Sequence, residues 1–370
     1  MVSTMITEGK AITLLDENTY AETMEKTVLP AMTKVCTHGW MNPATYPGLK
    51  ELPAPAGSHH GMLHYVSYRH PLASSQNQDL GNDGQGSGPE GSTIEERPSI
   101  VISHGFTGII PHYTELAYYF FQAGFDVWIM EHRGHGLSPH DVTDPSVIWI
   151  DDWRRYVVDL AKFAQEVVRP QTSGDLYLFA HSMGGGIGIS VAQQFPDIFS
   201  KIILTSPMIE AQMAGIPGPV AKRIARAFCR AGKGKNRVFA QKPFSPVLDP
   251  NSIRGLSAAR AQWRFDTRLT DKRYQTCAAS YQWVLQTFGL KKSLLNPANC
   301  AKIQASIMLF QAENDTFVRL DRQDEFIDMA QAADCDVEKV FIPQAMHDFS
   351  EGPNHILAPV LEQSIDFLGE

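Results

Sequence analysis

From residue 98 onward, short apolar runs alternate with longer stretches in which apolar residues recur every three or four positions. The first pattern is typical of buried strands and the second of helices that cover a sheet. Strands that alternate with helices imply parallel neighbours, so we predict an α/β fold with a mostly parallel sheet and helices on both faces. The predicted strands are 99–105, 125–136 (running into a turn), 175–180, 201–206, 305–311 and 337–342, and the predicted helices are 113–124, 151–168, 183–195 and 321–333.

The alternation stops between residues 207 and 299, where the sequence favours helices with many aromatic side chains. An insertion between two parallel strands lies over the carboxyl edge of the sheet, which is where such sheets bind ligands. We therefore interpret 207–299 as a helical cap between two parts of one core, 61–206 and 300–370. For any single aromatic residue of the cap, internal packing is a more common role than substrate contact.

The segment before the regular part has a weaker pattern. Residues 1–60 show no sustained periodicity and end in a proline-rich passage, so we expect an extension on the surface of the core. Residues 61–70 alternate enough for an edge strand, and 74–93 are a polar, glycine-rich loop. Neither 1–60 nor 74–93 indicates a function.

Composition narrows the class of protein. The chain has 370 residues, of which 43% are hydrophobic and 19% charged, as in soluble globular proteins. Five scattered cysteines without a C-x-x-C pair favour neither a disulfide framework nor a zinc site. The acidic N-terminus does not resemble a signal peptide, and no apolar run reaches the roughly 18 residues of a membrane span. We expect a cytoplasmic protein, with any membrane contact peripheral and at the inner face.

Charge is distributed unevenly along the chain. The net charge of −8 argues against a general nucleic-acid binder, yet residues 211–248 contain eight Lys or Arg and no Asp or Glu. Within this window Val220, Ile224 and Phe228 recur every four residues. The segment is either a solvated charged helix or an element that binds anionic lipid. The basic residues that would contact the lipid are Lys222, Arg223, Arg226 and Arg230.

The stretch LFAHSMGGG at 178–186 places Ser182 between a predicted strand and a predicted helix. A strand that turns at once into a helix forces the residue at the apex into a strained conformation and exposes its side chain above the sheet. The glycines at 184–186 are then needed because side chains there would collide with neighbouring strands. A phosphate-binding loop is the alternative, but G-x-x-x-x-G-K-[ST] is absent.

A serine hydroxyl becomes a nucleophile only when an oriented base takes its proton. Asp315 follows the predicted strand 305–311, and His347 follows the next strand, 337–342. Both loops leave the edge of the sheet where Ser182 is expected, in the chain order Ser, Asp, His. Glu313, two residues before Asp315, is an alternative acid, and Asp315 is otherwise a simple turn former.

Acyl transfer also needs donors for the oxyanion. The backbone N–H of Met183, directly after the serine, is one candidate, and the N–H of Phe106 in the loop after the first core strand is the other. We expect His104 to brace this loop.

The stretches of sequence around these residues resemble a known family, the α/β-hydrolases of the monoacylglycerol lipase and bacterial lysophospholipase branch. The lysophospholipases are the closer match. The resemblance covers about residues 60–370 and departs from G-x-S-x-G only in having Ala180 at the first position, which is small enough for the turn. It implies Ser182 as nucleophile, His347 as base, Asp315 as orienting acid, and Phe106 and Met183 as oxyanion donors. The stretches that carry it are SHGFTGIIPHYTELAYYFFQAGFDVWIMEHRGHGLS, LFAHSMGGG, ARAQWRFDTRLTDKRYQTCAASYQWV, LFQAENDTFV and AMHDFSEG.

Two other groups invite a chemical interpretation. His132 and His135 lie in a turn with no converging carboxylates or cysteines, so we expect no metal there and a loop fixed by Arg133 and its neighbours. Asp151 and Asp152 most simply cap the helix that follows.

These observations predict a serine ester hydrolase that cleaves a single-chain lipid through an acyl-enzyme, with lysophospholipid as first substrate and monoacylglycerol as second. It would need no metal or organic cofactor. Acyl transfer to an alcohol and lipid binding without turnover are the alternatives. Head group, acyl length and oligomeric state are not indicated by the sequence.

Overall fold

A computed structural model describes residues 12–50, 61–71, 97–239 and 241–370. The predicted polar loop at 74–93 and the first eleven residues lie outside these ranges. All described strands except two short ones belong to a single sheet, and the chain segments that the sequence marked as helices pack against its two faces.

The sheet has eight strands in the order β1-β2-β4-β3-β6-β7-β9-β10. The six strands from β4 to β10 pair in parallel, and β2 joins β4 in antiparallel register. The predicted α/β fold with a mostly parallel sheet is therefore confirmed. The strands are β1 (Cys36–Met41), β2 (Leu63–Tyr68), β3 (Ser99–Ser103), β4 (Asp126–Met130), β6 (Leu176–His181), β7 (Lys201–Thr205), β9 (Ser306–Ala312) and β10 (Val337–Ile342).

The N-terminal segment contributes more to the sheet than the sequence suggested. β1 pairs with β2 in antiparallel register over six residues, so 61–70 is an inner strand and the prediction of an edge strand there is wrong. The strand at the edge of the sheet is β1, whose exposed and half-buried residues show no clear alternation. Before it come α1 (Tyr20–Thr23), a π-helical segment at Met24–Val28 and α2 (Leu29–Val35).

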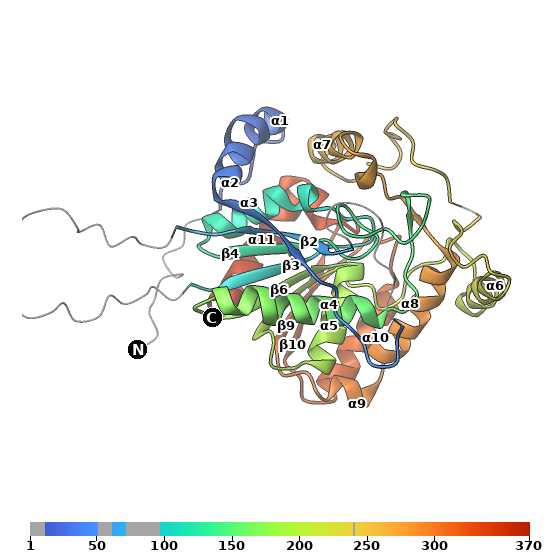
Figure 1. Ribbon diagram of the computed structural model, residues 1–370. Helices are drawn as coiled ribbons and strands as arrows, with labels where there is room; N and C mark the ends of the chain where they lie inside the picture. Colours follow the sequence, from blue (N-terminus) through green and yellow to red (C-terminus); the bar gives the residue numbers. More distant parts are fainter. Residues whose placement is uncertain (1–11, 51–60, 72–96, 240) are drawn as a thin grey trace, which may run out of the picture.

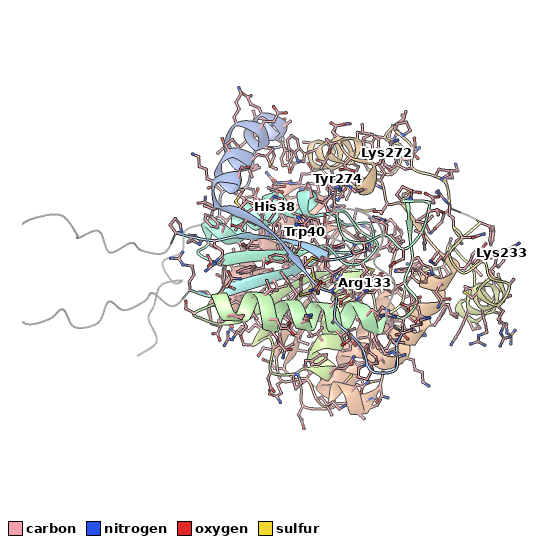
Figure 2. The ribbon with its side chains drawn as sticks, in the orientation of Figure 1. His38, Trp40, Arg133, Lys233, Lys272 and Tyr274 are labelled. Carbon is pink, nitrogen blue, oxygen red and sulfur yellow. The ribbon has the colours of Figure 1, made fainter. Side chains whose placement is uncertain are left out.

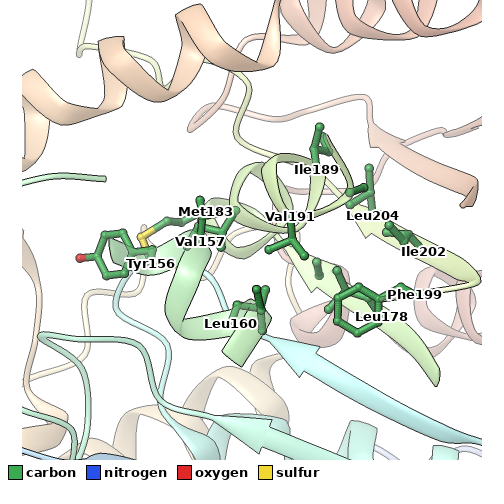
Figure 3. Packing of buried hydrophobic residues seen from close by; sticks show 14 of the residues in the cluster. Tyr156, Val157, Leu160, Leu178, Met183, Ile189, Val191, Phe199, Ile202 and Leu204 are labelled. Carbon is green, nitrogen blue, oxygen red and sulfur yellow. The ribbon is translucent and has the colours of Figure 1, made fainter. Parts of the chain in front are cut away.

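Two hydrophobic clusters cover the two faces of the sheet. Along β3, Val101 belongs to one cluster while Ile100 and Ile102 belong to the other, because successive side chains of a strand point to opposite faces. The first face packs against α4 (Arg154–Lys162), α5 (Met183–Gln194) and α10 (Leu320–Gln331), and part of this packing is drawn in Figure 3. The second packs against α3 (Thr114–Gln122), α11 (Asn354–Gly369) and the N-terminal helices.

Between β7 and β9 the chain leaves the sheet, and we call residues 207–299 the cap. In Figure 1, α6 lies beyond the right-hand end of the sheet and α7 lies above the sheet, on the side of α1, while α8 runs beside α5. The helices of this segment are α6 (Gly218–Arg230), α7 (Ala258–Leu269) and α8 (Tyr281–Leu294), and α9 (Pro297–Cys300) ends one residue beyond it. A two-residue strand, β8 (Ala278–Ala279), pairs with β5 (Val147–Ile148) from the core and so links the cap to it. None of the described helices is both long and apolar enough to cross a membrane.

Candidate active site

Ser182 stands alone between β6 and α5. Its backbone has φ 52° and ψ −116°, a conformation that costs a non-glycine residue about 1–3 kcal/mol and is retained only where its surroundings enforce it. Here Ser182 N donates to Thr205 O at 3.0 Å, and Ser182 O accepts from Met208 N at 2.8 Å and Gly186 N at 3.2 Å. The neighbouring strand β7 and the chain that follows it therefore hold the predicted strained turn in place.

The glycines after Ser182 sit against backbone atoms of neighbouring segments. A Cβ added at Gly184 would be 2.1 Å from Ser103 O, and one at Gly186 would be 2.6 Å from Met208 O. One at Gly185 would be 2.9 Å from the Cα of Pro207. The steric reason predicted for these glycines is confirmed, because α5 approaches the end of β3 and the chain after β7 too closely for side chains.

Ser182, His347 and Asp315 meet at the carboxyl edge of the sheet. Ser182 Oγ lies 2.8 Å from His347 Nε2, and His347 Nδ1 lies 2.6 Å from Asp315 Oδ2. An ionised carboxylate only accepts hydrogen bonds, so Nδ1 carries the proton of the neutral imidazole and Nε2 is free to accept from the serine hydroxyl. The three residues thus form one directed hydrogen-bond chain.

Asp315, and not Glu313, is the carboxylate that contacts the imidazole. Its Oδ1 accepts from the backbone N–H of Phe317 at 2.8 Å and of Val318 at 3.0 Å. Burial alone would raise the pKa of Asp315, but the hydrogen bond and charge of His347 together with these amides outweigh it and keep that pKa below its ordinary value. Glu313 Oε2 instead accepts from Gln344 N at 2.7 Å, so it braces the loop that follows β10.

The loop after β3 lies directly beside the serine. A Cβ added at Gly105 would be 2.9 Å from the His181 ring and 3.1 Å from Ser182 Cβ. His104 braces this loop as expected, because Nδ1 donates to Gly105 O at 2.8 Å while Nε2 accepts from His132 N at 2.9 Å. Phe106 follows in the same loop, and Met183 opens α5, where first-turn amides have no carbonyl partner within the helix.

His132 and His135 are buried beside His104, with ring centroids 4.6 and 4.9 Å from that ring. Burial keeps the pKa of both far below the ordinary value, so they are neutral packing groups. Arg133, drawn in Figure 2, fixes the loop through Asp159, at 2.5 Å from Nε and 3.0 Å from Nη2. Over the described ranges, no cluster of three or more His, Cys, Asp or Glu is arranged to hold a metal ion.

At the start of α4 the N-cap residue is Trp153, which makes no side-chain capping bond, so the prediction that Asp151 and Asp152 cap this helix is wrong in detail. Asp152 Oδ1 accepts from Arg154 N, the first residue of the helix, at 3.0 Å, and Asp151 pairs with Arg155 at 2.6 Å. The two carboxylates therefore serve the helix and not a reaction.

We call Ser182, His347 and Asp315 the triad. Sequence reasoning missed three polar residues that surround it. His181, Arg264 and Asp348 belong to no recognised motif, although each lies in a stretch that carries the family resemblance. The His181 ring is 5.0 Å from the His347 ring, and burial lowers the pKa of His181 to about 4. A signal was present in α7, where arginines recur every four residues at 260, 264 and 268.

Comparison with known proteins shows the family of the chain. The family described as Hydrolase_4, serine aminopeptidase S33, matches residues 94–353, a span that contains the cap and all three residues of the hydrogen-bond chain. The chain belongs to this family. The hydrolase is 29% identical to lysophospholipase L2 of Escherichia coli K12 over 282 residues, which is 72% of this chain and 79% of that protein.

Solved structures agree on the fold. A soluble variant of monoglyceride lipase from Saccharomyces cerevisiae, in complex with a substrate analog, superposes with a TM-score of 0.62 at 17% identity, covering 91% of this chain and 97% of that one. A thermostable carboxyl esterase from Bacillus coagulans gives a TM-score of 0.66 at 14% identity, with 90% and 98% covered. The expected α/β-hydrolase fold is confirmed.

Proposed function

We propose that this hydrolase cleaves the acyl ester of a single-chain lipid, with lysophospholipid as first substrate and monoacylglycerol as second. The observation that carries the proposal is the hydrogen-bond chain from the Ser182 hydroxyl through His347 to Asp315. The similarity to lysophospholipase L2 over most of both chains supports the substrate class.

The geometry supports the following role for each group. His347 Nε2 takes the hydroxyl proton as Ser182 Oγ attacks the ester carbonyl, and Asp315 stabilises the imidazolium that forms. The N–H groups of Met183 and Phe106 hold the oxyanion. His347 then protonates the leaving glycerol oxygen, and the acyl group stays on Ser182. Water, deprotonated by His347, hydrolyses this acyl-enzyme and restores the serine.

Apolar side chains next to the triad suit an acyl chain. Phe317 is 65% exposed although its ring lies only 5.1 Å from the His347 ring. On the oxyanion side, the Phe106 ring packs 4.3 Å from Trp283 of α8. When an acyl chain covers such surfaces, each Å² of apolar area removed from water contributes about 25 cal/mol to the free energy of binding.

A substrate panel tests the proposal. We expect the purified enzyme to hydrolyse lysophosphatidylcholine, lysophosphatidylethanolamine and monoacylglycerol, and to release free fatty acid as the product. An amino-acid p-nitroanilide should be inert, because Phe317 offers no anion for a substrate amino group and the nearby Asp348 is already paired with Arg264. Hydrolysis of the anilide without hydrolysis of any lipid ester would contradict the proposal, and acyl transfer to added monoacylglycerol in place of fatty-acid release would indicate a transacylase.

We further propose that α6 brings the enzyme to an anionic membrane surface. Arg223, Arg226 and Arg230 are exposed, and Lys233 lies at the outer side of the molecule, away from the sheet (Figure 2). The apolar row expected to enter the lipid is only partly available: the Phe228 ring stacks on Tyr281 at 4.0 Å. Attraction of the cations by anionic head groups therefore carries the contact, at about 1 kcal/mol per basic residue.

Sedimentation with vesicles of phosphatidylglycerol and phosphatidylcholine measures this contact. Replacing Lys222, Arg223, Arg226 and Arg230 with glutamine should lower the fraction bound at least about tenfold at low salt. The matched control loses the same four charges elsewhere, at exposed lysines of the N-terminal helices, α8 and the loop after α9. Its substitutions are Lys26→Gln, Lys34→Gln, Lys292→Gln and Lys302→Gln. Equal binding by the two variants would refute the proposal.

A further inference from the structure

Helix α7 faces the core with arginines as well as with the apolar Ala261 and Trp263. Arg260 is 1% exposed, and its Nη2 contacts Glu115 Oε1 at 2.7 Å and Asn354 Oδ1 at 2.8 Å. Its guanidinium also lies 5.4 Å from the Tyr20 ring. Because a buried charge is retained only when it is paired, this residue fixes the start of α7 on the core. Its Nη1 donates to Gly352 O at 3.0 Å. Over the described residues, none of its hydrogen-bond partners Glu115, Asn354 and Gly352 bonds to a residue of the triad.

Arg264, one turn further along, reaches the triad's surroundings. Its Nη1 lies 2.6 Å from Asp348 Oδ2 and 2.5 Å from Glu351 Oε1. Its Nη2 donates to His112 Nδ1 at 3.3 Å. The three partners come from the loop after β10 and from the 3₁₀ turn Ile110–Tyr113 that follows the loop of Phe106. One cap side chain therefore joins the loop after β10 to the 3₁₀ turn that follows the Phe106 loop.

Asp348 stands between the cap and the two histidines beside the serine. It directly follows His347, and its Oδ2 is 3.7 Å from His181 Nε2. Its Oδ1 accepts from the backbone N–H of Ser350 at 3.0 Å and from the Ser350 hydroxyl at 2.6 Å. The position of the imidazole and the charge near it thus both depend on how Asp348 is held.

We propose that Arg264 is a positioning residue that acts through Asp348 on His347: it fixes the loop that carries the base and cancels the negative charge of Asp348. The proposal rests on the function assigned above to His347. With Arg264 in place, Asp315 is the anion that acts on the imidazolium. Without it, a second, half-buried carboxylate would add its charge one residue away.

The electrostatics of the cluster agree with this role. Burial would raise the pKa of Asp348, but Arg264, His181 and Ser350 outweigh it and hold that pKa well below the ordinary value. Burial and the charge of Asp348 raise the pKa of Glu351. The ion pair is therefore Arg264 with Asp348, and Glu351 takes up a proton first on acidification. The titratable or charged groups facing the pair and its histidine are Tyr113, His112, His181, Asp315, His347, Glu351 and Arg268.

Arg264→Gln should shift the acid limb of the pH profile of kcat/KM upward by about one pH unit. The sign follows from charge: an uncompensated Asp348 carboxylate stabilises the imidazolium, so His347 stays protonated and inactive up to a higher pH. The Ser350 donors remain and keep Asp348 ionised. The readout is hydrolysis of a short p-nitrophenyl ester, which does not depend on a lipid head group.

Three further variants separate positioning from mere structure. Arg264→Lys keeps the charge, so the acid limb should stay at its wild-type pH. The double variant Arg264→Gln/Asp348→Asn removes both charges, so its acid limb should return toward the wild-type pH. The matched control, Arg260→Gln, also loses a buried cap arginine and should lower stability without moving the limb. A limb that stays in place in Arg264→Gln, moves equally in Arg260→Gln, or fails to return in the double variant would overturn the inference.

Stability and labelling keep the outcomes distinct. Should Arg264→Gln not fold, Arg264→Lys and the double variant decide, because a limb displaced to the same extent in both would refute a role for the Asp348 charge. Failure of the proposed function has another signature, namely a wild-type enzyme that hydrolyses no ester and is not labelled by a fluorophosphonate. An active, labelled wild type with unmoved limbs refutes only the role of Arg264.

Discussion

Replacing Ser182 with alanine will lower kcat for lysophospholipid and monoacylglycerol hydrolysis by about 10⁴-fold or more. The substitution removes the hydroxyl oxygen that lies 2.8 Å from His347 Nε2. Without this oxygen, no acyl-enzyme can form at this site. Residual activity would come from oxyanion donors and bound water. Fatty-acid release measured over hours at high enzyme concentration gives the rate.

A serine in the helix that follows Ser182 provides the control. Ser190 is fully buried in α5, and its Oγ accepts from Gln194 Nε2 at 2.8 Å, far from any role in the reaction. Ser190→Ala should retain kcat within about twofold while it loses a little stability. Full activity in Ser182→Ala, with Ser190→Ala equally active, would show that the hydroxyl at the strained turn is not the nucleophile.

Gly184→Ala will lower the free energy of unfolding by about 3 kcal/mol or more, the upper part of the range for overpacked cores. The new methyl group would stand 2.1 Å from Ser103 O and 2.6 Å from His104 O. Both are backbone oxygens of β3 and its loop, which cannot rotate away as a flexible side chain can. Urea unfolding followed by circular dichroism measures the change, and esterase activity should fall with it because the Phe106 loop must move.

Gly234→Ala is the matched control for this substitution. Its nearest neighbours, Cys229 Sγ and Gln282 Oε1, would be 3.4 Å from a Cβ, which is ordinary van der Waals contact. Its stability should stay within about 1 kcal/mol of wild type. Equal stability of Gly184→Ala and Gly234→Ala would mean that the helix after the serine does not approach β3 as closely as described.

Local patterns made the core of the fold predictable. The parallel strands from β4 to β10 are short apolar runs between amphipathic segments, and the helices that connect them imply that neighbouring strands are parallel. Ser182 was identifiable because a strand, one polar residue and three glycines have few structural explanations. Asp315 and His347 were identifiable because each directly follows a predicted strand of the same sheet.

Features that depend on distant segments were not predictable. The alternation of β1 is weak, and only its pairing with β2 shows that it forms the edge of the sheet. Glu313 and Asp315 are both acidic and two residues apart, so the choice between them needed the backbone path of the loop. The ion pair of Arg264 with Asp348 joins residues 84 apart in the chain, and no local pattern encodes such a contact.

The central claim is that the Ser182 hydroxyl is activated by His347. Its most direct test is to treat the enzyme with a fluorophosphonate and locate the adduct by peptide mass spectrometry, in wild type and in His347→Ala. We expect one stoichiometric adduct on the peptide containing Ser182 in wild type and a rate of labelling reduced by several orders of magnitude in His347→Ala. An adduct on another residue, or labelling of Ser182 that is equally fast without the imidazole, would contradict it.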